Sequence, residues 1–287
     1  MTPTLAQPHL PLAGTTPRGV DRCARARDWA EIQERMLVPL YEAVYERLEI
    51  GSGTRLLSLG CGSGLALLMA ASRGASVTGV DPAAPERLAL ARERLAPDAS
   101  WGEQPDGAAR LVEGDPADIA GPDVPAFNTV TAFQPIGCVA GDSEGLSGLL
   151  ESTVPLAGRG IPVVLVGWGP PERCTTSSVL KVATKLADPL RSTGSWRPAL
   201  RDDLEEVAQR AGLKPDGSGR VACPFGYADT DSAVRGLLST GLFDAAVGAT
   251  DQVQVDKELT EALHPYKRRD GTIWMPNVFR YLIARTR

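Results

Sequence analysis

The stretch Leu56-Leu57-Ser58-Leu59-Gly60-Cys61-Gly62-Ser63-Gly64 decides the fold. Residues Arg55–Leu59 read as a short apolar strand, and glycine then recurs at every second position up to Gly64, where helix-forming residues begin. Glycines between a strand and a helix permit a tight turn and allow a ligand to lie against the backbone, near the positive end of the helix dipole. The pattern therefore predicts a strand–loop–helix unit that binds a ligand.

Apolar strands and helical segments alternate on both sides of this loop. The strands are expected at Arg55–Leu59, Ala75–Val80, Arg110–Glu113, Phe127–Phe133, Ile161–Trp168, Arg220–Phe225 and Thr272–Ala284, and helices at Gly64–Arg73, Pro85–Leu95, Ser143–Pro155 and Leu200–Ala211. Strands separated by helices indicate βαβ units with right-handed crossovers. The sequence therefore predicts an α/β fold around a mostly parallel sheet.

The remaining segments predict the domain organisation. Residues 1–27 are expected to form a flexible leader, and residues 28–287 one domain that starts with a helix from Asp28 to about Ile50, kinked at Pro39. Two insertions, about 170–198 and 228–270, follow late strands. We expect these two helical insertions to fold together as a cap over the carboxyl edge of the sheet.

Composition excludes several classes of protein. The chain has 287 residues, 30 Lys and Arg against 35 Asp and Glu, and a formal net charge of −5, so a dedicated nucleic-acid binder is not expected. Only two histidines and five scattered cysteines occur, which predicts neither a metal site nor a disulfide framework and favours the cytoplasm. Ile161–Trp168 is the longest strongly apolar stretch and is too short to span a membrane. A soluble monomer or homodimer is expected.

Two acidic positions follow later strands. Asp81 ends the second strand, 21 residues after Gly60, where a carboxylate can accept hydrogen bonds from two ribose hydroxyls. Asp115 follows the third strand, within Glu113-Gly114-Asp115, and two interpretations stay open for it. It could accept a hydrogen bond from an adenine amino group, or it could cap the helical turn that starts at Pro116.

The spacing of the loop, G-x-G-x-G rather than G-x-G-x-x-G, counts against a nicotinamide cofactor. Leu56–Gly64, Asp81, Gly114-Asp115 and Phe127–Phe133 together resemble the class I S-adenosylmethionine-dependent methyltransferases, over roughly residues 29–170. Segments of the tail, such as Phe279-Arg280-Tyr281-Leu282, are similar to small-molecule methyltransferases of bacterial secondary metabolism. The resemblance implies a Rossmann-like, seven-stranded sheet with an antiparallel last strand, cap insertions after strands five and six, and S-adenosylmethionine as cofactor.

The resemblance also implies roles for individual residues. Those expected to contact the cofactor are Gly60, Cys61, Gly62 and Gly64 at the methionine part, Asp81 at the ribose, Asp115 and Pro116 at the adenine, and Gln134 near the methionine part. Trp29 and Tyr41, on the N-terminal helix, are candidates for closing over the cofactor. An apolar acceptor could be walled by Trp29, Phe133, Trp168 and Tyr227, for which core packing is the alternative.

Two positions depart from the family pattern. Family members usually have an acidic residue two positions before the first glycine, where this chain has Ser58, and an Asp opening the fourth strand, where it has Asn128. His264 is the only plausible imidazole base, and a helix C-cap is the alternative role for it. These departures leave room for a relative that has lost methyl transfer.

The leading hypothesis is methyl transfer from S-adenosylmethionine to a small natural product, as in antibiotic biosynthesis, by in-line displacement. The alternative is a cyclase or another non-methylating enzyme with this fold that retains the cofactor. A nicotinamide-dependent oxidoreductase is a third hypothesis.

Overall fold

A seven-stranded sheet forms the centre of the structure, a computed structural model that describes residues 21–82, 84–96, 109–119, 125–138, 142–187 and 203–287. The strand order is β3-β2-β1-β4-β5-β9-β6, in which β9 is antiparallel to both of its neighbours. The bounds are β1 Arg55–Leu59, β2 Ser76–Val80, β3 Arg110–Val112, β4 Thr129–Ile136, β5 Pro162–Trp168, β6 Lys214–Ala222 and β9 Val278–Arg285. The predicted seven-stranded, mostly parallel sheet is confirmed.

Helices cover both faces of this sheet because its strands are apolar on both sides. Leu56 and Leu57 of β1 point to opposite faces and belong to two separate hydrophobic clusters. One cluster includes side chains of α2, α3 and α4, and the other those of α5 and α7. The bounds are α2 Val38–Arg47, α3 Leu65–Ala71, α4 Pro85–Leu95, α5 Asp142–Thr153 and α7 Asp203–Arg210.

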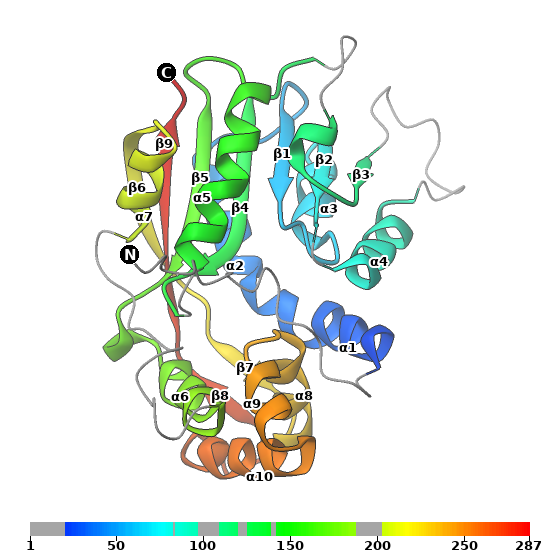
Figure 1. The fold of residues 1–287 in the computed structure, drawn as a ribbon, viewed down its shortest axis with the longest axis vertical. Helices are drawn as coiled ribbons and strands as arrows, with labels where there is room; N and C mark the ends of the chain where they lie inside the picture. Colours follow the sequence, from blue (N-terminus) through cyan, green and yellow to red (C-terminus); the bar gives the residue numbers. More distant parts are fainter. Residues whose placement is uncertain (1–20, 83, 97–108, 120–124, 139–141, 188–202) are drawn as a thin grey trace, which may run out of the picture.

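A cap of four helices lies beyond the carboxyl ends of β4 and β5 (Figure 1). It consists of α6 Thr176–Ala187, α8 Thr230–Ser239, α9 Asp244–Ala249 and α10 Gln252–Leu263. Helix α6 comes from the first insertion and packs against α9 and α10 of the second. The described residues of both insertions therefore share one layer, in which α9 is a helix that the sequence did not predict. No helix in the described part of the chain has the length and apolar character needed to cross a membrane.

The last two expected strands are wrong in their bounds. The expected strand Thr272–Ala284 is two strands, β8 Ile273–Met275 and β9, and β8 pairs with β7 Phe225–Tyr227 in a separate sheet. Pro276 separates them because proline has no N–H for a strand ladder. Strand β6 begins at Lys214, and the prediction placed its start at Arg220 because the glycines in the first half of β6 obscure the strand pattern of the sequence.

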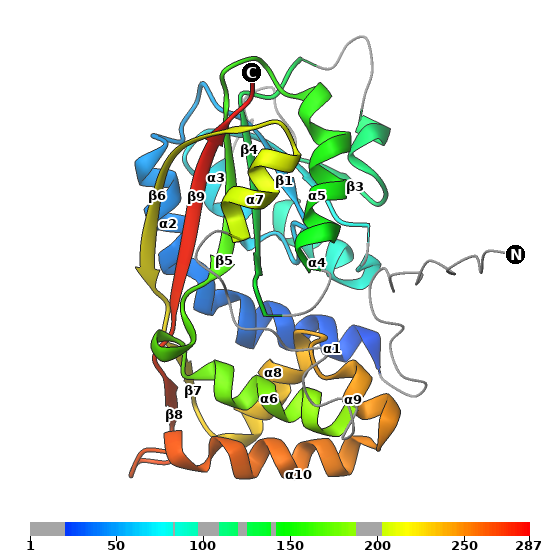
Figure 2. The same ribbon diagram turned by 60° about the vertical axis from the view of Figure 1, so that its left-hand side comes forward.

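The N-terminal segment is not the single helix that was expected. It consists of α1 Arg22–Asp28, a π-helical turn η1 Trp29–Gln33, a 3₁₀ turn η2 Glu34–Leu37 and then α2. The expected kink at Pro39 is not where the irregularity lies, because η1 and η2 precede this residue. Pro39 lies in the first turn of α2, where a backbone N–H has no partner within the helix and its absence costs nothing. Figure 2 shows this segment between the sheet domain and the cap, where α1 and η1 contact α4 and α8. Of the expected leader 1–27, residues 1–20 lie outside the described residues.

Candidate functional site

The glycine loop lies between β1 and α3, at the carboxyl edge of the sheet. Gly60, Gly62 and Gly64 all have left-handed backbone conformations, with φ of 61°, 57° and 79°. The backbone N–H groups of Gly60 and Cys61 donate to the Val80 carbonyl, at N–O distances of 2.8 and 3.2 Å, and this attaches the loop to β2. The loop thus needs glycine for its backbone at all three positions.

The first and third glycines of the loop have different neighbours. A Cβ built on Gly60 would lie 3.4 Å from Oε1 of Gln134, so the structure brings these two candidate residues together, and their contact with a cofactor stays a prediction. A Cβ on Gly64 would lie 2.9 Å from Cβ of Ala91 in α4. Gly64 therefore permits the close packing of α3 and α4, whatever its relation to a ligand.

Asp81 holds the middle of the loop. Its Oδ2 accepts a hydrogen bond from the backbone N–H of Gly62, at 3.1 Å, and the residue is only 6 % exposed. The sequence predicted a ribose-binding carboxylate at this position and did not predict this bond. The carboxylate that follows β2 is therefore placed beside the loop and helps to fix its shape.

Glu34 is a site residue that the sequence analysis missed. A Cβ built on Gly62 would lie 3.2 Å from its Oε1, and its Oε2 accepts hydrogen bonds from Ser63 Oγ and from Arg94 Nη1, the latter at 2.9 Å. Glu34 is 2 % exposed. Burial raises its pKa above the ordinary glutamate value, although Ser63, Arg94 and the Leu65 backbone N–H favour the charged form. A buried acidic residue beside a ligand loop is a functional candidate.

The raised pKa of Glu34 predicts how stability depends on pH. A carboxyl group whose pKa is higher in the folded than in the unfolded state contributes most to the free energy of unfolding at pH values below its unfolded-state pKa. This contribution is lost as pH rises through the folded-state pKa. We expect the free energy of unfolding of wild type, relative to Glu34→Gln, to fall as pH rises from below to above the ordinary glutamate pKa. Urea titrations of both proteins across this range measure the difference, and a difference that rises with pH would contradict the burial cause.

Trp29 lies beside Glu34 over the same glycine. Its Nε1 would be 3.2 Å from a Cβ on Gly62, and this N–H is buried without a hydrogen-bond partner in the described structure. The guanidinium of Arg87, in α4, stacks on the indole ring with its Cζ 4.3 Å from the ring centroid. Trp29 thus faces the loop with Nε1, the only polar atom of its side chain.

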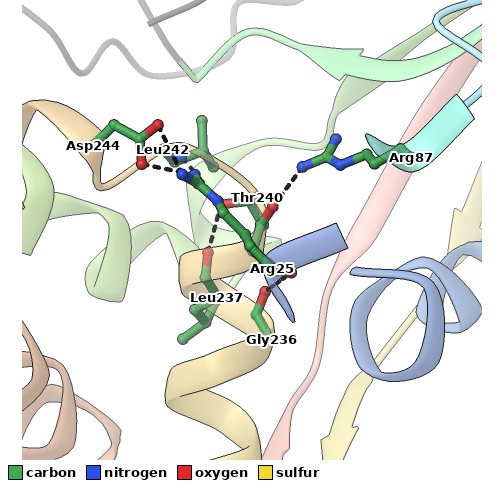
Figure 3. Close-up of polar contacts among 8 residues, drawn as sticks. Arg25, Arg87, Gly236, Leu237, Thr240, Leu242 and Asp244 are labelled. Carbon is green, nitrogen blue, oxygen red and sulfur yellow. Dashed lines mark hydrogen bonds and ion pairs between the residues drawn. The ribbon is translucent and has the colours of Figure 1, made fainter. Parts of the chain in front are cut away.

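Arginines connect the sheet domain, the N-terminal segment and the cap (Figure 3). Arg25 of α1 binds Asp244 of α9 through two hydrogen bonds of 3.1 and 2.7 Å. Arg87 donates to the carbonyl of Ser239, the last residue of α8, where the helix dipole favours a cation. The first contact joins the N-terminal segment to the cap, and the second joins α4 of the sheet domain to the cap.

The two departures from the family pattern have different surroundings. Ser58 is buried and lies opposite Thr131 of β4, whose buried Oγ1 has no partner in the described structure. No carboxylate stands at that point of β1. Asn128 uses both ends of its amide, since its Oδ1 accepts from Arg55 N–H at 2.7 Å and its Nδ2 donates to the Gly53 carbonyl at 2.8 Å. An aspartate could not donate the second bond.

The adenine-side candidates form a capped turn. Asp115 Oδ1 accepts from the backbone N–H of Ala117, at 2.8 Å, at the start of the 3₁₀ turn η3 Pro116–Ile119. Its Oδ2 lies 3.4 Å from Ser152 Oγ of α5, and Pro116 is buried. The capping role, one of the two that the sequence left open, is thus present, and the adenine contact stays a prediction.

The four aromatic candidates do not form one wall. Phe133 packs against Tyr41 of α2, with ring centroids 4.7 Å apart, in the core on that face of the sheet. Trp168 packs on Phe279 at 4.7 Å and is half-buried between the sheet and β7. Tyr227 is buried, and Trp29 lies at the loop. Trp168 and Trp29 keep some exposure, whereas Phe133 and Tyr227 serve the core.

The hydroxyl of Tyr227 donates to Gln33 Oε1, at 2.8 Å, in the interior. Tyr227→Phe should lower the free energy of unfolding by about 1–2 kcal/mol, because the buried amide oxygen then loses its donor. Chemical denaturation measures this change. Tyr266→Phe is the matched control, since that hydroxyl bonds Ser178 at an exposed position, and its effect should stay within about 0.5 kcal/mol. Equal effects of the two substitutions would disprove the buried-bond explanation.

His264 does not join the loop. It is the exposed C-cap of α10, and α10 packs on the other cap helices at the end of the cap away from the sheet in both ribbon views. The structural role that the sequence left as the alternative is therefore the one observed. His9 lies outside the described residues.

Comparison with known proteins adds the following matches. Residues 57–144 match a family model described as "Methyltransferase domain". A S-adenosylmethionine-dependent methyltransferase from Thiobacillus denitrificans in complex with S-adenosyl-L-homocysteine is 18 % identical, with a TM-score of 0.52 over 94 % of this chain and 99 % of that one. YjhP from E. coli is 19 % identical (TM-score 0.52, 92 % and 99 % covered), and YcgJ from a Bacillus is 16 % identical (TM-score 0.51, 86 % and 97 % covered). No curated protein matches.

Proposed function

We propose that this chain, which has a class I methyltransferase fold and whose residues 57–144 match a methyltransferase domain, transfers a methyl group from S-adenosylmethionine to a small molecule. The observation that carries the proposal is the left-handed glycine loop held by Asp81 at the carboxyl edge of the sheet. Ligands of open α/β sheets bind at that edge.

The residues at the loop fit such a cofactor by their chemistry. The Trp29 N–H, which has no hydrogen-bond partner in the described structure, is a donor, and the buried Glu34 carboxylate is an acceptor. The Asp81 carboxylate lies beside the same loop. The bound cofactor supplies a methyl group on a positively charged sulfur, which is already activated for displacement. The chain then has to orient donor and acceptor and exclude water, and alignment of this kind can lower a barrier by roughly 7–11 kcal/mol.

The cap supports a small acceptor. Its helices lie over the carboxyl edge of the sheet (Figure 1), and the half-buried Trp168 stands at the end of β5. A covered edge suits an enclosed small molecule better than the surface of a protein or nucleic acid. We place the reaction in bacterial secondary metabolism and the protein in the cytoplasm, as a monomer or homodimer.

A second function, cofactor binding without methyl transfer, is favoured by one observation. The described residues around the loop include no imidazole, and His264 is exposed at the far end of the cap. An oxygen or carbon acceptor often needs a base, whereas a neutral amine needs little help. The absence of an imidazole near the loop in the described residues therefore agrees with an enzyme, such as a cyclase, that binds the cofactor and does not activate a methyl acceptor.

Calorimetry and isotope labelling test these functions. Wild type should bind S-adenosylhomocysteine, and binding of NAD alone would refute the proposal. Incubation with methyl-labelled S-adenosylmethionine and a small-molecule extract of the source cells should then move label into a product. Product formation with all label left on the donor would favour the second function.

A further inference from the structure

Two polar side chains of the N-terminal segment converge on Gly62. Oε1 of Glu34 and Nε1 of Trp29 would each lie 3.2 Å from a Cβ built on that glycine. One atom is a carboxylate oxygen of a 2 % exposed residue, and the other is a buried N–H without a partner in the described structure. A hydrogen-bond acceptor and an orphaned donor therefore stand side by side over the ligand loop.

An acceptor and a donor so close together complement an α-amino acid, which carries an ammonium and a carboxylate on one carbon. Resting on the proposed function, we infer that Glu34 binds the ammonium and Trp29 the carboxylate of the amino-acid end of S-adenosylmethionine. The chain has no carboxylate at Ser58, two positions before the loop, so the acidic group comes instead from the N-terminal segment. A buried N–H without a partner is costly, and a ligand carboxylate would satisfy it.

Both side chains are held in place by other elements. Arg94 of α4 and Ser63 of the loop bind Oε2 of Glu34, and the Leu65 backbone N–H also favours the carboxylate, whose Oε1 lies towards Gly62. Arg87 of α4 stacks on the Trp29 ring. Because groups that are already ordered lose little freedom on binding, this support favours recognition of a charged ligand end.

The segment has the irregular backbone that this placement needs. Trp29 begins the π-helical turn η1 and Glu34 begins the 3₁₀ turn η2. Glu34 is thus five positions after Trp29, whereas residues that share a face of a regular α-helix are three or four positions apart. Turns of this kind are frequent at functional sites. The competing explanation is structural: Glu34 only pairs with Arg94, and Trp29 only packs beneath Arg87.

Calorimetry with three ligands separates the two explanations. The probes are S-adenosylhomocysteine, its deaminated analogue, which lacks the ammonium, and its decarboxylated analogue, which lacks the carboxylate. Glu34→Gln should weaken binding of S-adenosylhomocysteine about tenfold or more and leave the deaminated analogue unchanged. Trp29→Phe, which keeps an aromatic ring but removes the N–H, should weaken S-adenosylhomocysteine binding about threefold to tenfold and leave binding of the decarboxylated analogue unchanged.

Matched controls use the same substitutions elsewhere. Glu31→Gln alters an exposed glutamate of the same segment, and Trp274→Phe alters an exposed indole in β8; neither should change any affinity. Losses of equal size for S-adenosylhomocysteine and the matching analogue, or no loss, would overturn the inference while the proposed function stands. Failure of wild type to bind S-adenosylhomocysteine would overturn both. If Glu34→Gln does not fold, wild type itself must prefer S-adenosylhomocysteine to the deaminated analogue about tenfold, and equal affinities would refute the inference.

Discussion

Asp81→Ala is expected to weaken binding of S-adenosylhomocysteine at least tenfold, about 1.4 kcal/mol. The substitution removes a carboxylate that can accept hydrogen bonds from ribose hydroxyls. It also removes the acceptor for the backbone N–H of Gly62, which is 3.1 Å from Asp81 Oδ2 in a buried position. The loop therefore loses its anchor together with its ligand contact, and both losses reduce affinity.

Asp81→Asn separates the two contributions. An asparagine oxygen can still accept from Gly62, so this variant should keep the loop in place while losing the charge. We expect an affinity between those of wild type and Asp81→Ala, measured by calorimetry on proteins with matched thermal unfolding. An unchanged affinity in Asp81→Ala would show that the ribose contact is misplaced, and the bond to Gly62 would then be purely structural.

The candidate site residues that were predicted from the sequence are positioned by regular strands. Gly60 and Asp81 each directly follow a parallel strand, and Gln134 lies near the end of a third, β4; the carboxyl ends of parallel strands meet at one edge. Strand order and the glycine pattern therefore determined where these residues come together. The structure adds contacts between them, such as that of Asp81 with the loop.

Glu34 could not be predicted because its position depends on a change of helix type. In a regular helix, the apolar stripe that includes Ile32 and Met36 faces the core, and Glu34 lies between these residues on another face. The π-helical and 3₁₀ turns alter the angle per residue, so that Glu34 becomes as buried as its apolar neighbours. Neither turn has a strong sequence signal, and the burial of a lone glutamate is uncommon.

The errors at the end of the sheet have a related cause. Strand β6 carries Gly217 and Gly219, which weaken any strand pattern, and the Tyr281 ring of β9 covers Gly219 so closely that a Cβ there would lie 2.4 Å from it. A cross-strand aromatic ring thus replaces the missing side chain. Such support comes from a strand that is distant in the chain, so the local sequence of β6 does not reveal it.

Gly64→Ala is expected to lower the free energy of unfolding by about 2–5 kcal/mol, the largest stability change of the substitutions considered for the loop. Two costs add. The backbone of Gly64 is left-handed, with φ of 79°, which costs a residue with a Cβ about 1–2 kcal/mol. The new methyl group would also lie 2.9 Å from Cβ of Ala91, and such overpacking typically costs about 1–3 kcal/mol.

Two further variants separate these costs by chemical denaturation. Gly160→Ala, at a φ of 69° with no heavy atom within 4 Å of the new Cβ, should show the backbone cost alone, about 1 kcal/mol. Ala91→Gly in the Gly64→Ala background removes the opposing methyl, so the double-mutant cycle should give a favourable coupling of about 1–3 kcal/mol. If the cycle gave no coupling and Gly64→Ala cost no more than Gly160→Ala, then α3 and α4 would have room to separate. The third glycine of the loop would then be required only for its backbone, and the close contact of these helices would not explain why glycine stands there.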